Sequence, residues 1–88
     1  MITPLVLKSN LSSSENKKLR REFTKRLANK LKELRKYKKI TQQELAEKAS
    51  LHLTYIGHLE LAKYHPTVFV MWKIARALEV SMNELTNI

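Results

Sequence analysis

Apolar residues recur at helical spacing through most of the chain. The first stripe consists of five residues at intervals of four or three: Leu19, Phe23, Leu27, Leu31 and Leu34. This spacing brings them to one face of a helix, which we expect to pack inward. Ser12 and Glu15 offer a capping box ahead of the stripe. The pattern predicts a helix of about 24 residues that ends near Lys38.

Four shorter helices are expected to follow. They lie over residues 42–49, 53–60, 68–78 and a short stretch after Ser81. Thr41 with Glu44, and Ser81 with Glu84, have the spacing of capping boxes. The residues expected to face inward are Leu45, Ala46, Ala49, Ile56, Leu59, Met71, Ile74, Ala75, Leu78 and Leu85. One Gly and two Pro are too few turn residues for a multi-strand sheet, so we predict an all-α fold of five helices.

Residues 1–11 are predicted to form an extended N-terminal arm, and residues 12–88 one small domain. Pro4 pushes Thr3 toward an extended conformation. The arm is too apolar for a comfortable exposed tail, so we expect it to pack against something. Pairing as a strand with the same segment of a second subunit is one possibility.

Positive charge is concentrated in one segment. The net charge is +9, and residues 17–39 hold twelve Lys or Arg against only Glu22 and Glu33. Residues 40–88 hold four basic and five acidic side chains. This asymmetry favours a polyanionic partner, with nucleic acid ahead of an acidic membrane surface. The plainer alternative is a solvated helix face that keeps a small protein soluble.

The composition and motifs argue against several classes of function. The chain has no cysteine, which excludes disulfides and thiolate metal sites and fits a cytoplasmic protein. Its longest apolar run, residues 68–72, is far too short to span a membrane. His52, His58 and His65 are spaced by six and seven residues and do not share a helical face, so we expect no metal. No catalytic constellation is visible, which predicts a protein that is not an enzyme and needs no cofactor or small-molecule substrate.

Residues 41–60 carry the most informative pattern. A capped helix over 42–49, a break at Ser50-Leu51-His52 and a second helix over 53–60 have the layout of a helix-turn-helix. This unit places its second helix in the major groove of DNA.

A longer series of residues carries a family resemblance. It runs in order through Leu34-Arg35, Ile40-Thr41-Gln42-Gln43-Glu44-Leu45-Ala46, Tyr55-Ile56, Leu59-Glu60, Pro66, Ile74-Ala75, Leu78, Val80-Ser81 and Glu84-Leu85. With these, residues 27–86 resemble the lambda-repressor and Cro type of helix-turn-helix, the Xre family. The basic lead-in and short length are also similar to the controller proteins of restriction–modification systems. The resemblance implies a five-helix lambda-repressor-like fold in a dimeric, DNA-binding transcription regulator, with 53–60 as the recognition helix.

The resemblance also implies contacts to the DNA backbone. Family members bind a phosphate through a glutamine at the position of Gln42, and Gln43 is a further candidate. Lys63, Tyr64 and His65 form a loop that touches phosphates in similar proteins. The alternative for each of these residues is a solvent-exposed polar side chain.

Arg35 and Glu60 match an ion pair of the family. The pair ties the first helix to the end of the recognition helix and sets the arginine near a phosphate. A bidentate Arg–carboxylate pair fixes orientation better than a lysine would. Arg35 could instead be one more solvated charge. Glu60, the only acidic residue between Glu47 and Glu79, favours the pair.

Two turn positions depart from the family pattern. Ala62 and Ser50 stand where family members commonly have glycine. If Ala62 is left-handed, its side chain costs about 1 kcal/mol.

The predicted recognition helix has an unusual surface. Its candidates for base contact are His52, Leu53, Thr54, Gly57 and His58, and Leu61 also faces outward. No Arg, Lys, Asn or Gln lies between Ala49 and Ala62, so the commonest contacts to guanine and adenine are missing. Histidine and threonine can still hydrogen-bond to bases, Leu53 can touch a thymine methyl, and Gly57 permits close approach to a base edge. The same surface also suits a protein partner.

Apolar residues on more than one face of 68–78 suggest a subunit contact. Phe69, Val70 and Trp72 either contact a second subunit or wrap the long first helix within the monomer. Leu85 and Ile88 are further candidates for the contact.

Together these patterns predict a sequence-specific regulator that binds double-stranded DNA as a homodimer. The alternative is a protein-interaction module, such as an antitoxin or a regulatory partner, with a repurposed helix-turn-helix. A third idea is non-specific binding of nucleic acid or anionic membrane by the basic helix alone.

Overall fold

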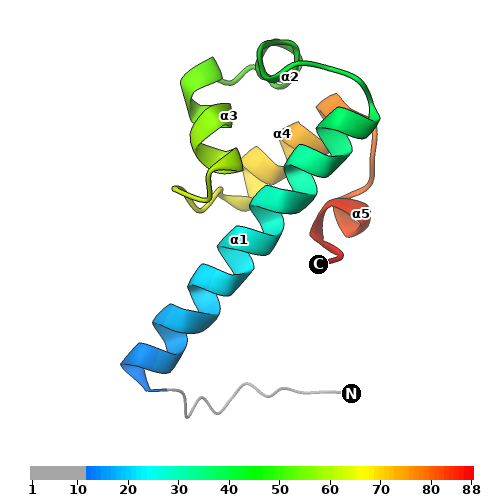
Figure 1. Cartoon of the computed structure of the whole chain (residues 1–88). Helices are drawn as coiled ribbons and strands as arrows, with labels where there is room; N and C mark the ends of the chain where they lie inside the picture. Colours follow the sequence, from blue (N-terminus) through cyan, green and yellow to red (C-terminus); the bar gives the residue numbers. More distant parts are fainter. Residues whose placement is uncertain (1–11) are drawn as a thin grey trace.

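A computed structural model describes residues 12–88. Within this range it contains five helices and no strands: α1 (Ser13–Tyr37), α2 (Gln42–Ala49), α3 (Leu53–Glu60), α4 (Val68–Leu78) and α5 (Met82–Thr86) (Figure 1). The predicted all-α fold of five helices is confirmed. The expected N-terminal arm, residues 1–11, lies outside the described residues.

Hydroxyl side chains begin four of the five helices. Ser12 and Thr41 each form a complete capping box, with Glu15 and Glu44 respectively. Thr67 caps α4 by accepting from Val70 N at 3.1 Å. The third box is only half formed, because Ser81 accepts from the backbone N–H of Glu84 but no bond returns from the Glu84 side chain.

The core lies between the C-terminal half of α1 and the four short helices. It contains apolar residues from every helix: Leu27, Leu31, Leu34, Leu45, Ala46, Ile56, Leu59, Met71, Ile74, Ala75, Leu78 and Leu85. α2 packs on α3 and α4, while α1 packs on α3 and α5. Every residue expected to face inward from the short helices is buried. This packing fixes the orientation of α3 relative to α1.

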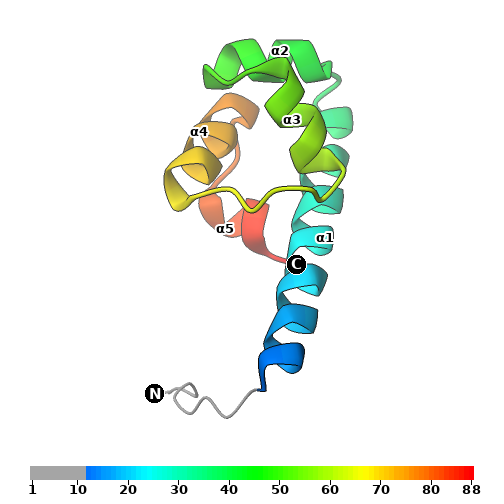
Figure 2. The ribbon, with the colours of Figure 1, turned by 90° about the vertical axis from the view of Figure 1, so that its left-hand side faces the viewer.

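Leu19 and Phe23 were expected in the core, and this expectation is wrong. Their side chains are 52% and 42% exposed. The N-terminal part of α1 extends beyond the bundle, and no other described helix packs on it (Figures 1 and 2). Burial along α1 begins only at Thr24. Helical periodicity identified the apolar face but not where its partner ends.

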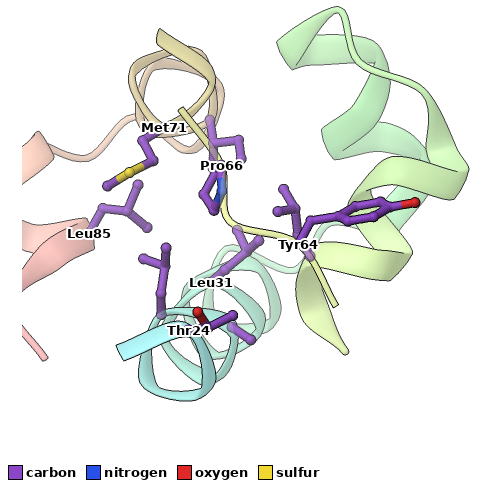
Figure 3. Close-up of a pocket in the computed structure, with 10 residues that line it drawn as sticks. Thr24, Leu31, Tyr64, Pro66, Met71 and Leu85 are labelled. Carbon is purple, nitrogen blue, oxygen red and sulfur yellow. The ribbon is translucent and has the colours of Figure 1, made fainter. Parts of the chain in front are cut away.

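A small apolar cavity of about 10 Å³ lies between α1, α4, α5 and the segment that joins α3 to α4 (Figure 3). Thr24, Leu31, Pro66 and Leu85 are among the residues that line it. Its volume is at the lower limit for one water molecule, so it is a packing gap rather than a ligand site. The ring of Tyr64 lies at its edge, and its hydroxyl points away toward α3 (Figure 3).

Candidate nucleic-acid interface

Three helices meet at the carboxylate of Glu60. Its Oε2 accepts from Arg35 Nε at 2.6 Å, and its Oε1 accepts from Arg35 Nη2 at 3.0 Å. Gln42 Nε2 donates to the same Oε1 at 2.9 Å. Arg35 Nη1 also donates to the backbone oxygen of Ile40 at 2.9 Å. The cluster therefore links α1, the first residue of α2 and the last residue of α3.

The Glu60 cluster is buried and its charges are matched. The residue is 4% exposed. Burial raises the pKa of Glu60, but hydrogen bonds from Arg35 and Gln42, with the charges of Arg35 and Lys32, hold it below the ordinary value. The hydrogen bond to Glu60 raises the pKa of Arg35. The predicted ion pair is present as a structural link, with three of the five guanidinium N–H donors committed within the protein.

The outer surface of α3 and its N-cap is open and carries no Lys, Arg, Asp or Glu side chain. His52, Leu53 and Thr54 are exposed, while Gly57 and His58 are half-buried. The one carboxylate of α3, Glu60, is turned into the protein, so this surface presents no acidic group that would repel a polyanion. His52 occupies the N-cap without a side-chain hydrogen bond to the helix.

Gly57 faces the start of α2. A Cβ built at Gly57 would lie 3.8 Å from Gln42 Oε1, which is an ordinary van der Waals contact. The glycine is therefore not required by packing within this chain.

Aromatic side chains join α3 to the segment that follows it. The Tyr55 and Tyr64 rings stack at a centroid distance of 5.6 Å, and His58 meets Tyr64 edge-on at 5.1 Å. Burial, followed by the nearby Tyr64, raises the pKa of Tyr55. The stack holds the Tyr64 ring against the side of α3.

The loop after α3 is fastened to α1. His65 Nδ1 lies 2.7 Å from the hydroxyl oxygen of Thr24, and that hydroxyl donates to the backbone oxygen of Arg20 at 2.8 Å. His65 is therefore the donor in its bond with Thr24. Ala62 turns the chain with φ of 61°, and Ser50 has φ of 55°. Both positions are left-handed, as expected where the family uses glycine.

The model of the HTH_3 helix-turn-helix family matches residues 31–85, which contain α2, α3 and the Glu60 cluster. The chain belongs to this helix-turn-helix family. The resemblance noted in the sequence is thereby confirmed. The N-terminal part of α1 lies outside the match.

Two curated helix-turn-helix relatives are bacterial or phage proteins. The immunity repressor protein of Bacillus phage phi105 is 34% identical over 55 residues, which are 62% of this chain and 38% of the repressor. The uncharacterized HTH-type transcriptional regulator y4dJ of Sinorhizobium fredii is 36% identical over 52 residues, 59% of this chain and 68% of that protein. The chain thus matches little more than a third of the phage repressor's length.

Two solved structures share the helix-turn-helix fold. The restriction–modification controller protein C.AhdI from Aeromonas hydrophila has a TM-score of 0.69 and 29% identity, covering 70% of this chain and 94% of that chain. An HTH_3 family transcriptional regulator from Vibrio cholerae has a TM-score of 0.73 and 30% identity. It covers 75% of this chain and 37% of that one.

The predicted site residues come from the end of α1, the start of α2, α3 with its N-cap, and the loop that follows α3. Gln43, Lys63, Tyr64 and His65 are exposed, and Gln42 is half-buried against Glu60. Sequence reasoning missed the bonds from Gln42 to Glu60 and between His65 and Thr24, because no local motif signals either. Among residues 12–88 no acidic and histidine side chains gather where they could hold a metal ion. None of the described helices is long and apolar enough to cross a bilayer.

The residues predicted to contact a second subunit differ in their exposure. Leu85 is 1% exposed within the monomer, so its assignment to a subunit contact is wrong. Phe69 and Trp72 stay 63% and 46% exposed and stack on each other at 6.2 Å, so they do not wrap α1. Val70 and Ile88 are partly buried against the core.

Proposed function

We propose that this protein is a sequence-specific DNA-binding transcription regulator, not an enzyme, that inserts α3 into the major groove. The observation that carries the proposal is the outer face of α3, open and free of acidic groups, with α3 held by the Glu60 cluster. The names of its helix-turn-helix relatives, a repressor, a transcriptional regulator and a controller, support the same function.

The proposed contacts divide into bases and phosphates. Base edges would be read by His52, Leu53, Thr54, Gly57 and His58. Phosphates would be held by Gln43, Lys63, Tyr64, His65 and the uncommitted N–H groups of Arg35 and Gln42. Because one N–H of the Gln42 amide is bound to Glu60, its second N–H is the one directed to phosphate.

A homodimer fits the stacked pair Phe69 and Trp72, which exposes apolar area on one face of α4. A dimer would place two copies of α3 about 34 Å apart, one helical turn of DNA, on a paired half-site. The dimer would act in the cytoplasm.

The test compares binding to DNA from upstream of the protein's own gene with binding to random duplex, across a salt series. The proposal predicts an affinity gap for the upstream DNA that persists as salt rises. Sedimentation of the same complexes gives the number of chains per duplex, expected to be two. Equal affinities that vanish together in moderate salt would contradict sequence-specific binding.

The second candidate is a protein-interaction module. It is favoured by the absence of Arg, Lys, Asn and Gln between Ala49 and Ala62 and by the exposure of Leu53 and Leu61. This candidate predicts no binding to duplex DNA even in low salt.

A further inference from the structure

The projecting part of α1 lies outside the region that the helix-turn-helix family explains. Residues 13–23 extend beyond the bundle, toward the side on which α3 and the α3–α4 connection lie (Figures 1 and 2). At 1.5 Å per residue this projection is about 16 Å long. That length corresponds to roughly five base-pair steps of DNA at 3.4 Å each.

A basic cleft lies where this helix passes the connection. It has a volume of about 320 Å³ and is formed by α1 and residues 61–65. Its polar side chains are Arg21, Thr24, Lys25, Lys63, Tyr64 and His65. No carboxylate lines it, and Glu22 lines a separate hollow with Leu19, Phe23, Arg26 and Ile88.

Within the described residues, the basic groups of the cleft form no ion pair. Among residues 12–88 the one ion pair is Arg35–Glu60, so Arg21, Lys25 and Lys63 have no acidic partner there. The walls of the cleft are held together by the bond between His65 and Thr24, whose hydroxyl is buried at the base of the loop. The cleft is thus a positively charged recess whose two walls are joined by a hydrogen bond.

We propose that this cleft holds a backbone phosphate of the DNA flanking the half-site, outside the helix-turn-helix footprint. Arg21 and Lys25 would supply charge-assisted hydrogen bonds to the phosphodiester oxygens. The cleft shares Lys63, Tyr64 and His65 with the phosphate-binding loop proposed above, so a backbone that follows the loop passes directly into it. This continuity favours DNA over an acidic protein. The inference rests on the proposed function.

The test uses two double variants on the same helix. Arg21→Gln with Lys25→Gln removes two charges from the cleft. Arg26→Gln with Lys30→Gln is the matched control, because these residues line a different hollow, with Asn87 and Ile88. They lie about 140° around the helix from the cleft pair. Circular dichroism melting checks that both variants fold as the wild type does.

The probes are two duplexes carrying a site selected by the wild-type protein from a random pool. One duplex ends at the edge of the selected base sequence, and the other continues for about ten base pairs on each side, one helical turn. Affinities are measured for each protein on both duplexes across a salt series.

The cleft predicts that the wild type and the control variant bind the longer duplex more tightly. The cleft variant should lose this preference. Its slope of log affinity against log salt should be smaller in magnitude by about 1.8, which is about 0.9 for the one phosphate in each of the dimer's two clefts. An equal loss of affinity in both variants, or no loss in the cleft variant, would contradict phosphate binding in the cleft. It would leave the proposal of DNA binding intact. A wild type that selects no duplex would overturn the proposed function, and the cleft with it.

Discussion

Arg35 and Glu60, 25 residues apart in the chain, form a bidentate ion pair whose two hydrogen bonds measure 2.6 and 3.0 Å. The pair spans from α1 to the last residue of α3 and draws in Gln42 from α2. The only carboxylate of α3 is therefore buried and paired inside the protein. The same contact that orients α3 also leaves its outer face without negative charge.

Removal of Arg35 should destabilise the fold strongly. Arg35→Ala leaves the carboxylate of Glu60, 4% exposed, with Gln42 as its remaining side-chain donor. The expected loss in free energy of unfolding is about 3 kcal/mol, measured by urea denaturation. The free energy of unfolding of Arg35→Lys should lie between those of the wild type and Arg35→Ala, because a lysine ammonium cannot replace the bidentate guanidinium. Lys36→Ala, at the exposed neighbour, should stay within about 0.5 kcal/mol of the wild type.

Stability should depend on pH through Glu60. Its pKa in the folded state lies below the ordinary value of 4.5, so the unfolded state binds the proton first as pH falls. The stabilisation is therefore complete well above pH 4.5 and is lost as pH falls through the lower, folded value. The stability difference between wild type and Glu60→Gln should shrink as the solution is acidified from about pH 6. A difference that stays constant down to the acid transition would contradict this coupling.

Replacement of Ala62 by glycine should stabilise the fold. With φ of 61° the alanine Cβ is strained, so Ala62→Gly should raise the free energy of unfolding by about 1 kcal/mol. Ala77→Gly, the same substitution within α4, should lower it by about as much. Thermal melting of both variants measures the difference. If Ala62→Gly melts no higher than the wild type, strain at this turn is not a cost to the fold.

Substitution of Gly57 should change the stability of the fold and the affinity for DNA in opposite directions. The nearest heavy atom to an added Cβ is 3.8 Å away, so Gly57→Ala should stabilise α3 by up to about 1 kcal/mol. If Gly57 allows a base edge to come close, the same variant should bind its selected duplex more weakly. Melting and titration on one preparation give both quantities. A higher melting temperature with unchanged affinity for the duplex would show that Gly57 does not contact DNA.

Local signals in the sequence were sufficient for most of the fold. Thr41 and Glu44 satisfy backbone groups within one turn, and the apolar spacing of the short helices needs no knowledge of their neighbours. The Arg35–Glu60 pair was also predicted, through the family resemblance and because Glu60 is isolated among uncharged residues.

Features that depend on tertiary placement were not predictable in this way. Leu19 and Phe23 have the correct period for a core face, but periodicity does not show whether another element covers that face. The contact of Thr24 with His65 joins residues 41 positions apart, and that of Gln42 with Glu60 joins residues 18 apart. No short-range pattern in the chain specifies either bond.

The position of α3 on DNA can be read by methylation protection of guanine N7, an atom that lies in the major groove. The wild type, on a duplex that it has selected, should protect guanines in both half-sites. Variants His52→Ala, at the exposed N-cap of α3, and His58→Ala, at a half-buried position of the helix, should lose protection at individual guanines while phosphate contacts persist. Tight, sequence-specific binding that leaves every N7 in the site reactive would contradict insertion of α3 into the major groove.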